Sequence, residues 1–416
     1  MSPIARGSLL LAILALGLVA LALLVLPDQP MVDEHFHQGQ IHLFLDGEFR
    51  MVPEITVTPG YHLVIAGPAA VFGTRDLLYL RLISAALAML TVFLAWTWWL
   101  RQGAESPLLR SMQILACPLL WPFYVLLYTD LLALVGLLAV LLLADAGRFR
   151  IAMLFGLATL FVRQTSVFWL GLIWLMAMHQ AGLGAAMSRP VELSRRLAGA
   201  GKAIRPALAR TWPLLVPLLA FVLFVVVNRG VAVGDRLSHQ VGGVYPSQIF
   251  FMLLVLWLVL LPLHLANLGR IAGLLRSRLW LVPALVLLGA AYMFSFEVSH
   301  HYNLGLPEFH LRNRVLGWLD GDWRWRLFAF PLMAWALLSV ALTPLTSKAA
   351  LWLFPVTVLA MLPAELIEQR YYIPPLVLWL LLRQAQSRAV EWTLLTWFAL
   401  LSTLIFAAVA STRYFL

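Results

Sequence analysis

Two carboxylates and an imidazole stand close together in the segment MVDEHFHQGQ, which covers residues 31–40. Asp33, Glu34 and His37 have side-chain types that act in proton transfer and that bind metal ions. The segment directly follows an apolar run near residues 8–26 that is long enough to cross a membrane. Because ionisable groups are costly to bury in a bilayer, this cluster at its edge is a candidate functional site.

Charged and polar residues interrupt the apolar sequence at several later points. They are Asp130 in YTD, Arg163 and Gln164 in RQT, Asp235, Arg236 and His239 in GDRLSH, His300 and His301, and Glu365, Glu368 and Arg370. Each alone has a simple explanation, such as a solvated loop end, an interface anchor or an ion pair within a turn. Together with Asp33 and Glu34, however, they all fall on one predicted side of the membrane. Several such groups on one face indicate a shared polar cavity, which we interpret as an active site open to that side.

A metal site is the first chemistry to consider for the acidic segment, since carboxylates and imidazoles are common metal ligands. The HExxH pattern, which places two histidines one helical turn apart around a glutamate, does not occur in the chain. Neighbours such as Asp33 and Glu34 point in different directions on a helix or a strand, so a joint ligand set would require an irregular loop. We therefore expect no metal cofactor, and a metal-dependent enzyme remains the alternative.

The elements that position these residues are predicted from a composition that is 62% hydrophobic and only 12% charged. Apolar stretches recur from end to end, each close to the roughly 20 residues that cross a bilayer, so we expect an all-α polytopic membrane protein with about 13 transmembrane helices. We expect one integral membrane domain over residues 1–416, and no disulfide, because the single cysteine lies within a predicted span. The predicted spans lie near residues 8–26, 77–100, 108–127, 131–144, 151–162, 165–178, 212–228, 247–268, 280–296, 327–343, 349–362, 373–382 and 391–410.

The first external loop, residues 27–76, carries the acidic segment and two further features. Ile41, Phe44 and Leu45 are spaced i, i+3 and i+4, which predicts a short helix in the plane of the interface. The PEITVTPG segment, residues 53–60, is too interrupted by proline and glycine to be a regular span and predicts an interfacial or re-entrant connector. Two other long loops are expected, a basic cytoplasmic loop over residues 179–211 and an external loop over residues 297–326.

The net charge of +10 is distributed unevenly across the predicted topology. The side that carries Arg6 holds most of the basic residues and few of the acidic ones, so the positive-inside rule makes it cytoplasmic. The basic loop 179–211 is either a surface for anionic lipids or a solvated linker. We expect membrane lipids rather than nucleic acid as partners of these charges. Arginine supplies nearly all of the 29 basic residues, which suggests a GC-rich bacterial genome and hence an inner-membrane protein with a periplasmic site. In a eukaryote the same topology would place the site in the lumen of the endoplasmic reticulum.

The polar motifs, taken together, resemble the dolichyl-phosphate-glucose α-1,2-glucosyltransferases of the asparagine-linked glycosylation pathway, within the GT-C superfamily. The resemblance extends over nearly the whole chain and consists of five ordered blocks. The first block matches at Asp33, Glu34, Phe36, His37, Gly47, Phe49, Pro53, Ile55, Thr56, Pro59 and Gly60. The other four match at Tyr128, Thr129 and Asp130; at Arg163, Gln164 and Thr165; at Gly234, Asp235, Arg236, Ser238 and His239; and at Glu368, Arg370, Tyr371, Pro374 and Pro375. The chain departs from the family at Met51 and Val52, where the family has Trp-Asp, and the 297–326 loop matches only loosely.

The resemblance implies a GT-C-type fold and transfer of a glucosyl group, with inversion, from a polyprenyl-phosphate donor to a hydroxyl of a glycan or lipid-linked acceptor. Asp33 would be the general base, with Glu34 as its positioning partner or substitute. A phosphate leaves as a stable anion, so cations would take the place of a general acid.

The candidate cations of the phosphate site are guanidinium groups, which bind phosphate oxygens in pairs and make a divalent ion unnecessary. The donor phosphate would be bound by Arg163, Arg236, Arg370 and His239. The sugar would be bound, or the arginines oriented, by His37, Asp130, Gln164, Asp235, Glu368 and Tyr371.

Two functions of other classes are compatible with a polar cavity in a membrane protein. A transporter or flippase of lipid-linked sugars would use the same charges as a relay, but such proteins often contain internal repeats with interrupted helices. No repeat of fixed period is evident in the sequence, and the polar blocks lie at the ends of spans. A structural membrane subunit would tolerate the loss of Asp33.

Overall fold

The apolar runs of the sequence form helices in the computed structural model, which describes residues 3–187, 193–235 and 242–415. No strand forms within these residues, so the all-α prediction is confirmed. The first half of the chain forms α1 (Pro3–Val25), α2 (Glu34–Leu45), α3 (Gly60–Phe72), α4 (Leu77–Arg101), α5 (Pro107–Leu115), α6 (Thr129–Asp145), α7 (Phe149–Val162), α8 (Val167–Met178), α9 (Gly184–Met187), α10 (Leu193–Thr211) and α11 (Leu215–Asn228). The second half forms α12 (Ser247–Val259), α13 (Leu261–Ala266), α14 (Leu268–Ser277), α15 (Leu281–Ser295), α16 (His301–Leu304), α17 (Leu311–Gly321), α18 (Trp323–Leu342), α19 (Leu353–Met361), α20 (Ile373–Leu382) and α21 (Arg388–Ala410). Short helical turns connect them: η1 (Pro122–Tyr124), η2 (Gln164–Ser166), η3 (His179–Leu183), η4 (Trp212–Leu214), η5 (Lys348–Trp352) and η6 (Gln369–Tyr372).

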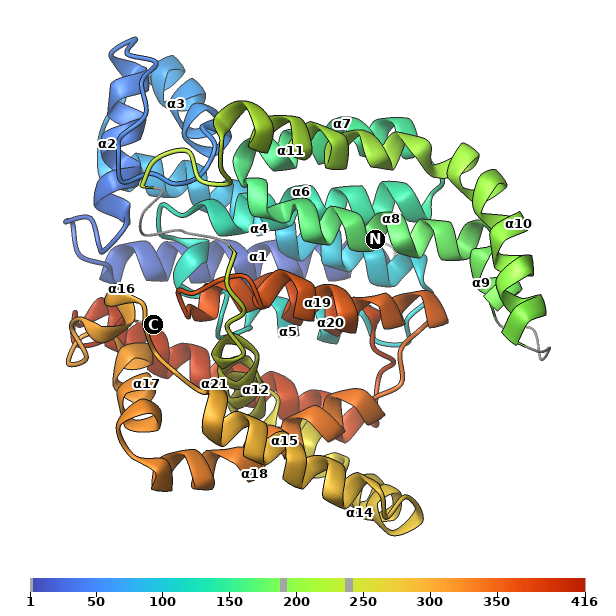
Figure 1. Cartoon of the computed structure of the whole chain (residues 1–416). Helices are drawn as coiled ribbons and strands as arrows, with labels where there is room; N and C mark the ends of the chain where they lie inside the picture. Colours follow the sequence, from blue (N-terminus) through green and yellow to red (C-terminus); the bar gives the residue numbers. More distant parts are fainter. Residues whose placement is uncertain (1–2, 188–192, 236–241, 416) are drawn as a thin grey trace.

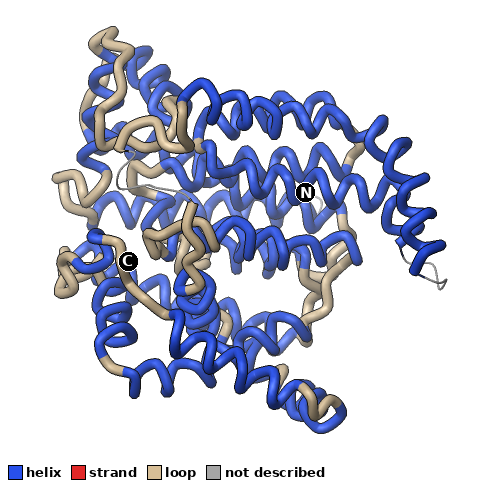
Figure 2. The backbone as a smooth tube through the Cα atoms, viewed as in Figure 1, coloured by secondary structure: helices blue, strands red, loops and turns tan. Residues whose placement is uncertain are grey.

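The molecule has two distinct ends. In Figure 1, α2, α3, α16 and α17 gather at one end of the bundle, on the left of the view, while α10 and α14 lie at the other end. The helix α1 runs between them and delivers the chain to α2. Much of the chain that is not helical lies at the end with α2 and α16 (Figure 2). The irregular segments that carry the polar motifs are therefore grouped at one end of a helical scaffold.

The core of the scaffold is formed by helices that are too enclosed to face lipid. Most residues of α6 are buried, including Leu134, Leu137 and Leu141, and α20 is buried from Pro375 to Leu382. The helix α6 packs against α4, α7 and α8. Close van der Waals packing between these helices fixes the start of α6 in place.

Six helices in the described part of the chain are long and apolar enough to cross a membrane. They are Ile4–Val25, Leu77–Arg101, Gln164–Ala186, Gly201–Asn228, Trp323–Leu342 and Arg388–Ala410. A seventh results if α14 and α15, which meet at 108°, are counted as one span. Their outer faces expose large apolar side chains, such as Leu24 on α1, Val227 on α11 and Phe294 on α15. Such faces are typical of contact with lipid.

The predicted number of about 13 spans is not confirmed, because several predicted spans are short or interrupted helices. The predicted span 108–127 consists of α5 and the turn η1, which begins at Pro122. The predicted span 247–268 is divided into α12 and α13 at Leu260, just before Pro262. Proline lacks the backbone N–H that continues a helix, so hydropathy alone joins segments that the backbone separates.

The first external loop contains the short helix that was predicted from its apolar spacing. Ile41 and Phe44 of α2 are buried against Tyr61 and Ile65 of α3, in a small apolar cluster of their own. The helix α2 ends at Leu45, and Gly47 follows with φ +79°, a left-handed conformation that glycine adopts without strain. The connector after it stays irregular up to Pro59, immediately before α3.

Candidate active site

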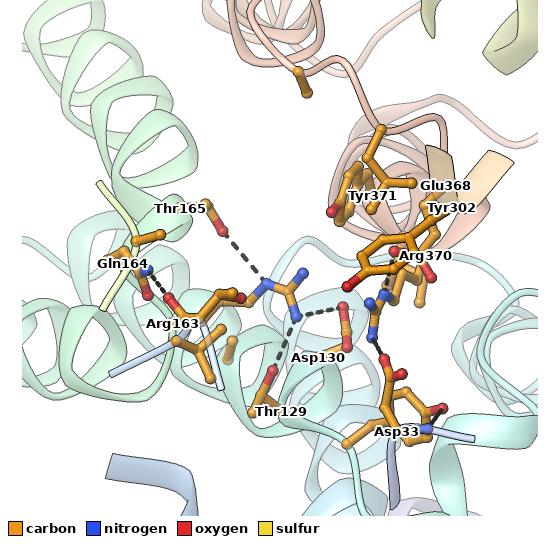
Figure 3. Close-up of a pocket in the computed structure, with 18 of the residues that line it drawn as sticks. Asp33, Thr129, Asp130, Arg163, Gln164, Thr165, Tyr302, Glu368, Arg370 and Tyr371 are labelled. Carbon is orange, nitrogen blue, oxygen red and sulfur yellow. Dashed lines mark hydrogen bonds and ion pairs between the residues drawn. The ribbon is translucent and has the colours of Figure 1, made fainter. Parts of the chain in front are cut away.

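A cavity of about 530 Å³ lies where α2, the start of α6 and α16 meet. The predicted site residues that line it are Asp33, His37, Asp130, Arg163, Gln164, Asp235, Glu368, Arg370 and Tyr371. They come from five separate stretches of sequence, and Figure 3 shows several of them directed toward one another. The structure thus brings together most of the residues that the sequence motifs singled out.

Arg370 is the centre of a chain of alternating charges on one side of the cavity. Its Nη1 lies 3.0 Å from Oδ2 of Asp33, and its Nε lies 2.6 Å from Oε2 of Glu368. The other oxygen of Glu368 lies 3.1 Å from Nη1 of Arg312. The guanidinium carbon of Arg370 also lies 5.5 Å from the centre of the Tyr128 ring, within the range of a cation–π contact. Arg370 is therefore held in position by two acids and a ring.

Arg163 forms a second cationic point in the cavity, at the end of α7. Its Nη1 lies 2.9 Å from Oδ1 of Asp130 and donates to the Thr129 hydroxyl at 2.9 Å, and its Nε donates to the Thr165 hydroxyl at 3.4 Å (Figure 3). Asp130 lies in the first turn of α6, where the helix dipole stabilises a carboxylate. The start of α6 thus supplies two of the three partners that orient this guanidinium group.

Both guanidinium groups keep one nitrogen available for a ligand. Within the described residues, Nη2 of Arg163 and Nη2 of Arg370 take part in none of the hydrogen bonds or ion pairs. A guanidinium group has five N–H donors, and two of them fit the oxygens of one phosphate. The arrangement can therefore bind an anion without breaking the ion pairs that hold the arginines.

The protonation states around Arg370 follow from burial and from neighbouring charges. Burial alone would raise the pKa of Glu368, but Arg370 and Arg312 outweigh it and hold that pKa below its ordinary value. Burial alone would lower the pKa of Arg370, but Glu368 and Asp33 outweigh it and hold that pKa well above its ordinary value. Burial, together with Glu368, raises the pKa of Tyr371 to about 12. Glu368 and Arg370 are thus ionised near pH 7, and the phenol of Tyr371 is neutral.

The backbone before Asp33 is strained, and this strain places the carboxylate. Val32 has φ +51°, a left-handed conformation that is unfavourable for a β-branched residue. The backbone N–H of Asp33 donates to the hydroxyl of Tyr128 at 3.3 Å. Asp33 stands immediately before α2, and about a third of its side chain is exposed to the cavity. It can therefore meet a substrate hydroxyl.

Glu34 points away from the cavity and is completely buried. Both of its oxygens bind Arg81 of α4, at 3.0 Å from Nε and at 2.6 Å from Nη2. The same carboxylate accepts the backbone N–H groups of Met31 and Leu127, each at 2.9 Å. Glu34 therefore connects the turn before α2 with the segment before α6, and of the two roles predicted for it this geometry favours positioning.

The connector after α2 is held against the cavity by Gln164. The amide nitrogen of Gln164 donates to the carbonyl oxygens of Thr56 and Val231, each at 2.8 Å, and its amide oxygen accepts the N–H of Thr58 at 3.2 Å. A Cβ atom at Gly234 would collide with the carbonyl oxygens of the connector, so the glycine of the GDRLSH motif permits a close approach. Gln164 therefore holds the backbone of the connector at the cavity wall.

His37 of α2 is buried beside the cavity and bonded to a second histidine. Its Nδ1 lies 2.9 Å from Nε2 of His62. Burial, with smaller effects of Arg370 and Arg163, lowers the pKa of His37 to about 3. The imidazole is therefore neutral near pH 7 and suits a hydrogen bond to a sugar or phosphate oxygen.

Two of the predicted phosphate ligands, Arg236 and His239, lie outside the described residues. Asp235, directly before them, lines the cavity. Their predicted roles remain predictions.

Three residues of the site were not identified from sequence. Arg312 pairs with Glu368, Tyr302 lines the cavity, and Arg81 binds Glu34. The first two lie in the 297–326 loop, where the motif match is loose, and Arg81 looks like an ordinary charge within an apolar run. An unpaired arginine inside a predicted span is energetically unfavourable, so Arg81 could have been predicted from sequence to have a buried acidic partner.

A metal ligand set was also sought in the structure. Among the described residues, no group of three or more His, Cys, Asp or Glu side chains is arranged to hold a metal ion. Asp33, Asp130 and Glu368 at the cavity are each paired with a guanidinium group, as described above.

The sequence profile of the DIE2/ALG10 family matches residues 27–381 of the chain. This range includes all the residues assigned to the site from sequence.

Similar full-length proteins are known from animals and plants. Proteins of mouse and human, each named Dol-P-Glc:Glc(2)Man(9)GlcNAc(2)-PP-Dol alpha-1,2-glucosyltransferase, are 26% and 24% identical to the chain, over 84% of its length and 83% of theirs. A protein of the same name from Arabidopsis thaliana is 23% identical over 89% of each chain. No solved structure matches the chain.

Proposed function

The chain belongs to the DIE2/ALG10 family, and we propose that it is an inverting glucosyltransferase that uses a polyprenyl-phosphate-linked glucose as its donor. The relatives' names specify a dolichyl-phosphate glucose donor and a lipid-linked oligosaccharide acceptor. We propose the same two substrate classes here, a polyprenyl-phosphate sugar and a hydroxyl of a lipid-linked glycan. The observation that carries the proposal is one cavity that holds an accessible carboxylate beside two oriented guanidinium groups.

The reaction requires a base on one side of the sugar and cations on the other. The acceptor oxygen attacks the anomeric carbon from the face opposite the phosphate, and its proton passes to the carboxylate of Asp33. The bond between the anomeric carbon and the phosphate oxygen breaks, and its electron pair stays with the polyprenyl phosphate. Attack from the opposite face inverts the configuration.

The leaving phosphate gains negative charge as this bond breaks. Arg163 lies across the pocket from Asp33 (Figure 3), and its Nη2 is the donor available to the phosphate oxygens, whereas Arg370 is bound to the carboxylate of Asp33. Donors fixed in advance at the place where charge develops supply the largest catalytic effect in many enzymes, about 2.7–4 kcal/mol for a single donor. Since a guanidinium group supplies this charge, we propose that the reaction needs no metal ion.

One part of the cavity wall is apolar, as an isoprenoid tail requires. It is formed by Ala133, Leu134 and Leu137 of α6, Phe168 and Trp169 of α8, Met361 of α19, and Ile373 and Pro374 of α20. Each buried CH₂ of a lipid tail contributes about 0.8 kcal/mol, so the tail remains in an apolar environment while the phosphate reaches the arginines.

The membrane arrangement is part of the proposal. We propose a single GT-C-type membrane domain in which shorter apolar helices, such as α7 and α12, complete the predicted spans beyond the six long ones. The cavity would face the periplasm of a bacterium, or the lumen of the endoplasmic reticulum in a eukaryote, with the basic end of the molecule in the cytoplasm.

The function is tested by incubating the purified protein with a panel of polyprenyl-phosphate sugars that differ only in the hexose. We expect selective loss of the glucose derivative, release of polyprenyl phosphate, and equal activity after treatment with a chelator. Turnover of none of the sugars would overturn the proposal. Loss of activity on chelation would instead indicate a metal-dependent transferase.

The same assay separates transfer from transport. A flippase would move the donor across a vesicle membrane and leave its glycosidic bond intact, whereas a transferase breaks that bond in detergent, where no sidedness exists.

A further inference from the structure

The segment of residues 300–306 forms part of the cavity wall and is held rigidly. The side chain of Asn313 donates to the carbonyl oxygens of Tyr302 at 2.7 Å and of Gly305 at 2.6 Å. Asn303 donates to the carbonyl oxygen of Ile367 at 2.8 Å and accepts the N–H of the same residue at 2.9 Å. Both asparagines are buried. The wall segment is thus joined to the stretch that carries Glu368 and Arg370, and the two cannot move independently.

This rigid segment presents an aromatic side chain to the cavity. Tyr302 lines the cavity, its residue is 48% exposed, and the centre of its ring lies 4.1 Å from that of His301. Leu306, also in the wall, has φ +48° and is therefore strained. A strained backbone is unfavourable, and strained residues cluster at binding sites, so this wall segment is a candidate for ligand contact.

The position of Tyr302 relates it to the acceptor more than to the donor phosphate. In Figure 3, Tyr302, Glu368 and Arg370 lie toward the same side of the pocket as Asp33, and Arg163 lies across from them. The base must be close to the attacking hydroxyl, so the acceptor approaches from the side of Asp33.

A carboxylate completes this part of the wall. Glu365 lines the cavity, and one of its oxygens accepts the hydroxyl of Ser299 at 2.7 Å. A carboxylate has two oxygens and about four acceptor sites, so it can also bind sugar hydroxyl groups. An aromatic face beside such acceptors matches a sugar ring, which has an apolar face of C–H groups and an edge of hydroxyls.

We propose that Tyr302 and Glu365 form a carbohydrate subsite that binds the acceptor glycan, with the sugar ring packed on the Tyr302 face. The subsite rests on the proposed glucosyl transfer and specifies where its acceptor binds. Tyr302 lies in the 297–326 loop, where the match to the family motifs is loose, so the subsite places an acceptor contact in a part of the chain that differs from the family.

The test measures transfer from polyprenyl-phosphate glucose to the lipid-linked oligosaccharide that the relatives' names specify, and, separately, slow transfer of the donor glucose to water. We expect Tyr302→Ala to raise the KM for the acceptor about tenfold, as the loss of a buried aromatic contact does, with hydrolysis of the donor unchanged. Tyr302→Phe keeps the ring and should stay within about twofold of the original KM. Glu365→Gln should raise the acceptor KM with little effect on hydrolysis.

Trp318→Ala is the matched control, because Trp318 is 50% exposed on α17 and does not line the cavity. An unchanged acceptor KM in Tyr302→Ala, with active protein, would overturn the subsite and leave the proposed function intact. Equal loss of transfer and hydrolysis would overturn it as well, since that pattern indicates damage to the donor site. Absence of donor cleavage in the unaltered protein would overturn the proposed function itself.

Discussion

Asp33 combines two properties that a general base in glycosyl transfer needs. Its carboxylate is partly exposed to the cavity, and its position is fixed by the ion pair with Arg370 and by the backbone bond to Tyr128. The same pair keeps Arg370 directed into the cavity.

Replacement of Asp33 separates catalysis from binding. Asp33→Asn keeps the shape of the side chain but removes the proton acceptor, so we expect kcat to fall by about 10²–10⁴-fold. The affinity for the donor should change little, because the phosphate contacts come from other residues. Single-turnover rates and donor binding measure the two effects. Near-normal turnover would exclude Asp33 as the base.

Replacement of Arg163, in contrast to that of Asp33, should weaken donor binding as well as the rate. Arg163→Lys keeps the charge but loses the fork that reaches Asp130 and a phosphate together. We expect donor affinity to fall about tenfold, with a loss of rate as well, in a titration with polyprenyl phosphate. Arg75→Lys, at an exposed ion pair outside the cavity, is the control. Unchanged binding would remove Arg163 from the phosphate site.

His37 gives the stability of the protein a specific pH dependence. Its pKa is lowered from 6.5 to about 3 by burial and then by Arg370 and Arg163, so between these values only the unfolded chain binds the proton. The free energy of unfolding therefore decreases as the pH falls below 6.5, by about 2 kcal/mol between pH 7 and pH 5. His37→Gln should show a smaller shift in Tm over this range in detergent. An equal shift would contradict the assignment.

At the level of residues, sequence reasoning depended on side chains that stand out from their surroundings. Asp33, Arg163 and Arg370 interrupt apolar runs, and each belongs to one of the motifs of the family resemblance. Their meeting in one cavity could therefore be predicted. The division of labour between Asp33 and Glu34 could not, because it depends on Arg81, a partner 47 positions away in α4. Sequence spacing carries no information about such a contact.

At the level of elements, the pair of Glu34 and Arg81 holds the site together. Arg81 also donates to the carbonyl oxygens of Pro27 at 2.7 Å and Gln29 at 3.2 Å, so it fixes the whole connection from α1 to α2. The carboxylate of Glu34 meanwhile binds the N–H of Leu127, two residues before α6. One buried ion pair thus positions both Asp33 and the start of α6, which orients Arg163.

Loss of one partner of this ion pair should lower the stability of the protein more than loss of both partners together. Glu34→Gln leaves the Arg81 charge buried without its partner, which typically costs about 3–5 kcal/mol, so we expect a clear fall in Tm and in kcat. Glu34→Gln combined with Arg81→Met leaves no unpaired charge and should recover part of the Tm. Additive losses in the double variant would contradict a coupled pair.

The elements themselves were predictable to different extents. Periodicity predicted α2 because its apolar side is buried on α3. Hydropathy did not detect that the helix in the segment 108–127 ends at Leu115, because buried irregular backbone is as apolar as a helix.

At the level of the whole molecule, the cavity and the basic residues of α10 and α14 lie at opposite ends. The cavity is at the end with α2 and α16, while α10 and α14, which carry Lys202, Arg205, Arg270 and Arg276, are at the other end (Figure 1). Long apolar helices such as α4 and α21 lie between them. This polarity is what a lipid-linked donor requires, since its phosphate must reach one membrane face while its tail stays in the apolar layer.

The orientation can be tested by labelling cysteines at the two ends. The only native cysteine, Cys117, is buried, so it contributes little background to labelling with a maleimide that does not cross membranes. Phe49→Cys lies in the exposed loop after α2, and Lys202→Cys lies on the exposed surface of α10. In intact bacterial cells we expect the first to react with the maleimide and the second to react only after permeabilisation, because the positive-inside rule places the α10 end in the cytoplasm. Reaction in the reverse order would show that the cavity faces the cytoplasm, and reaction of both in intact cells would show that the two ends do not lie on opposite faces of the membrane.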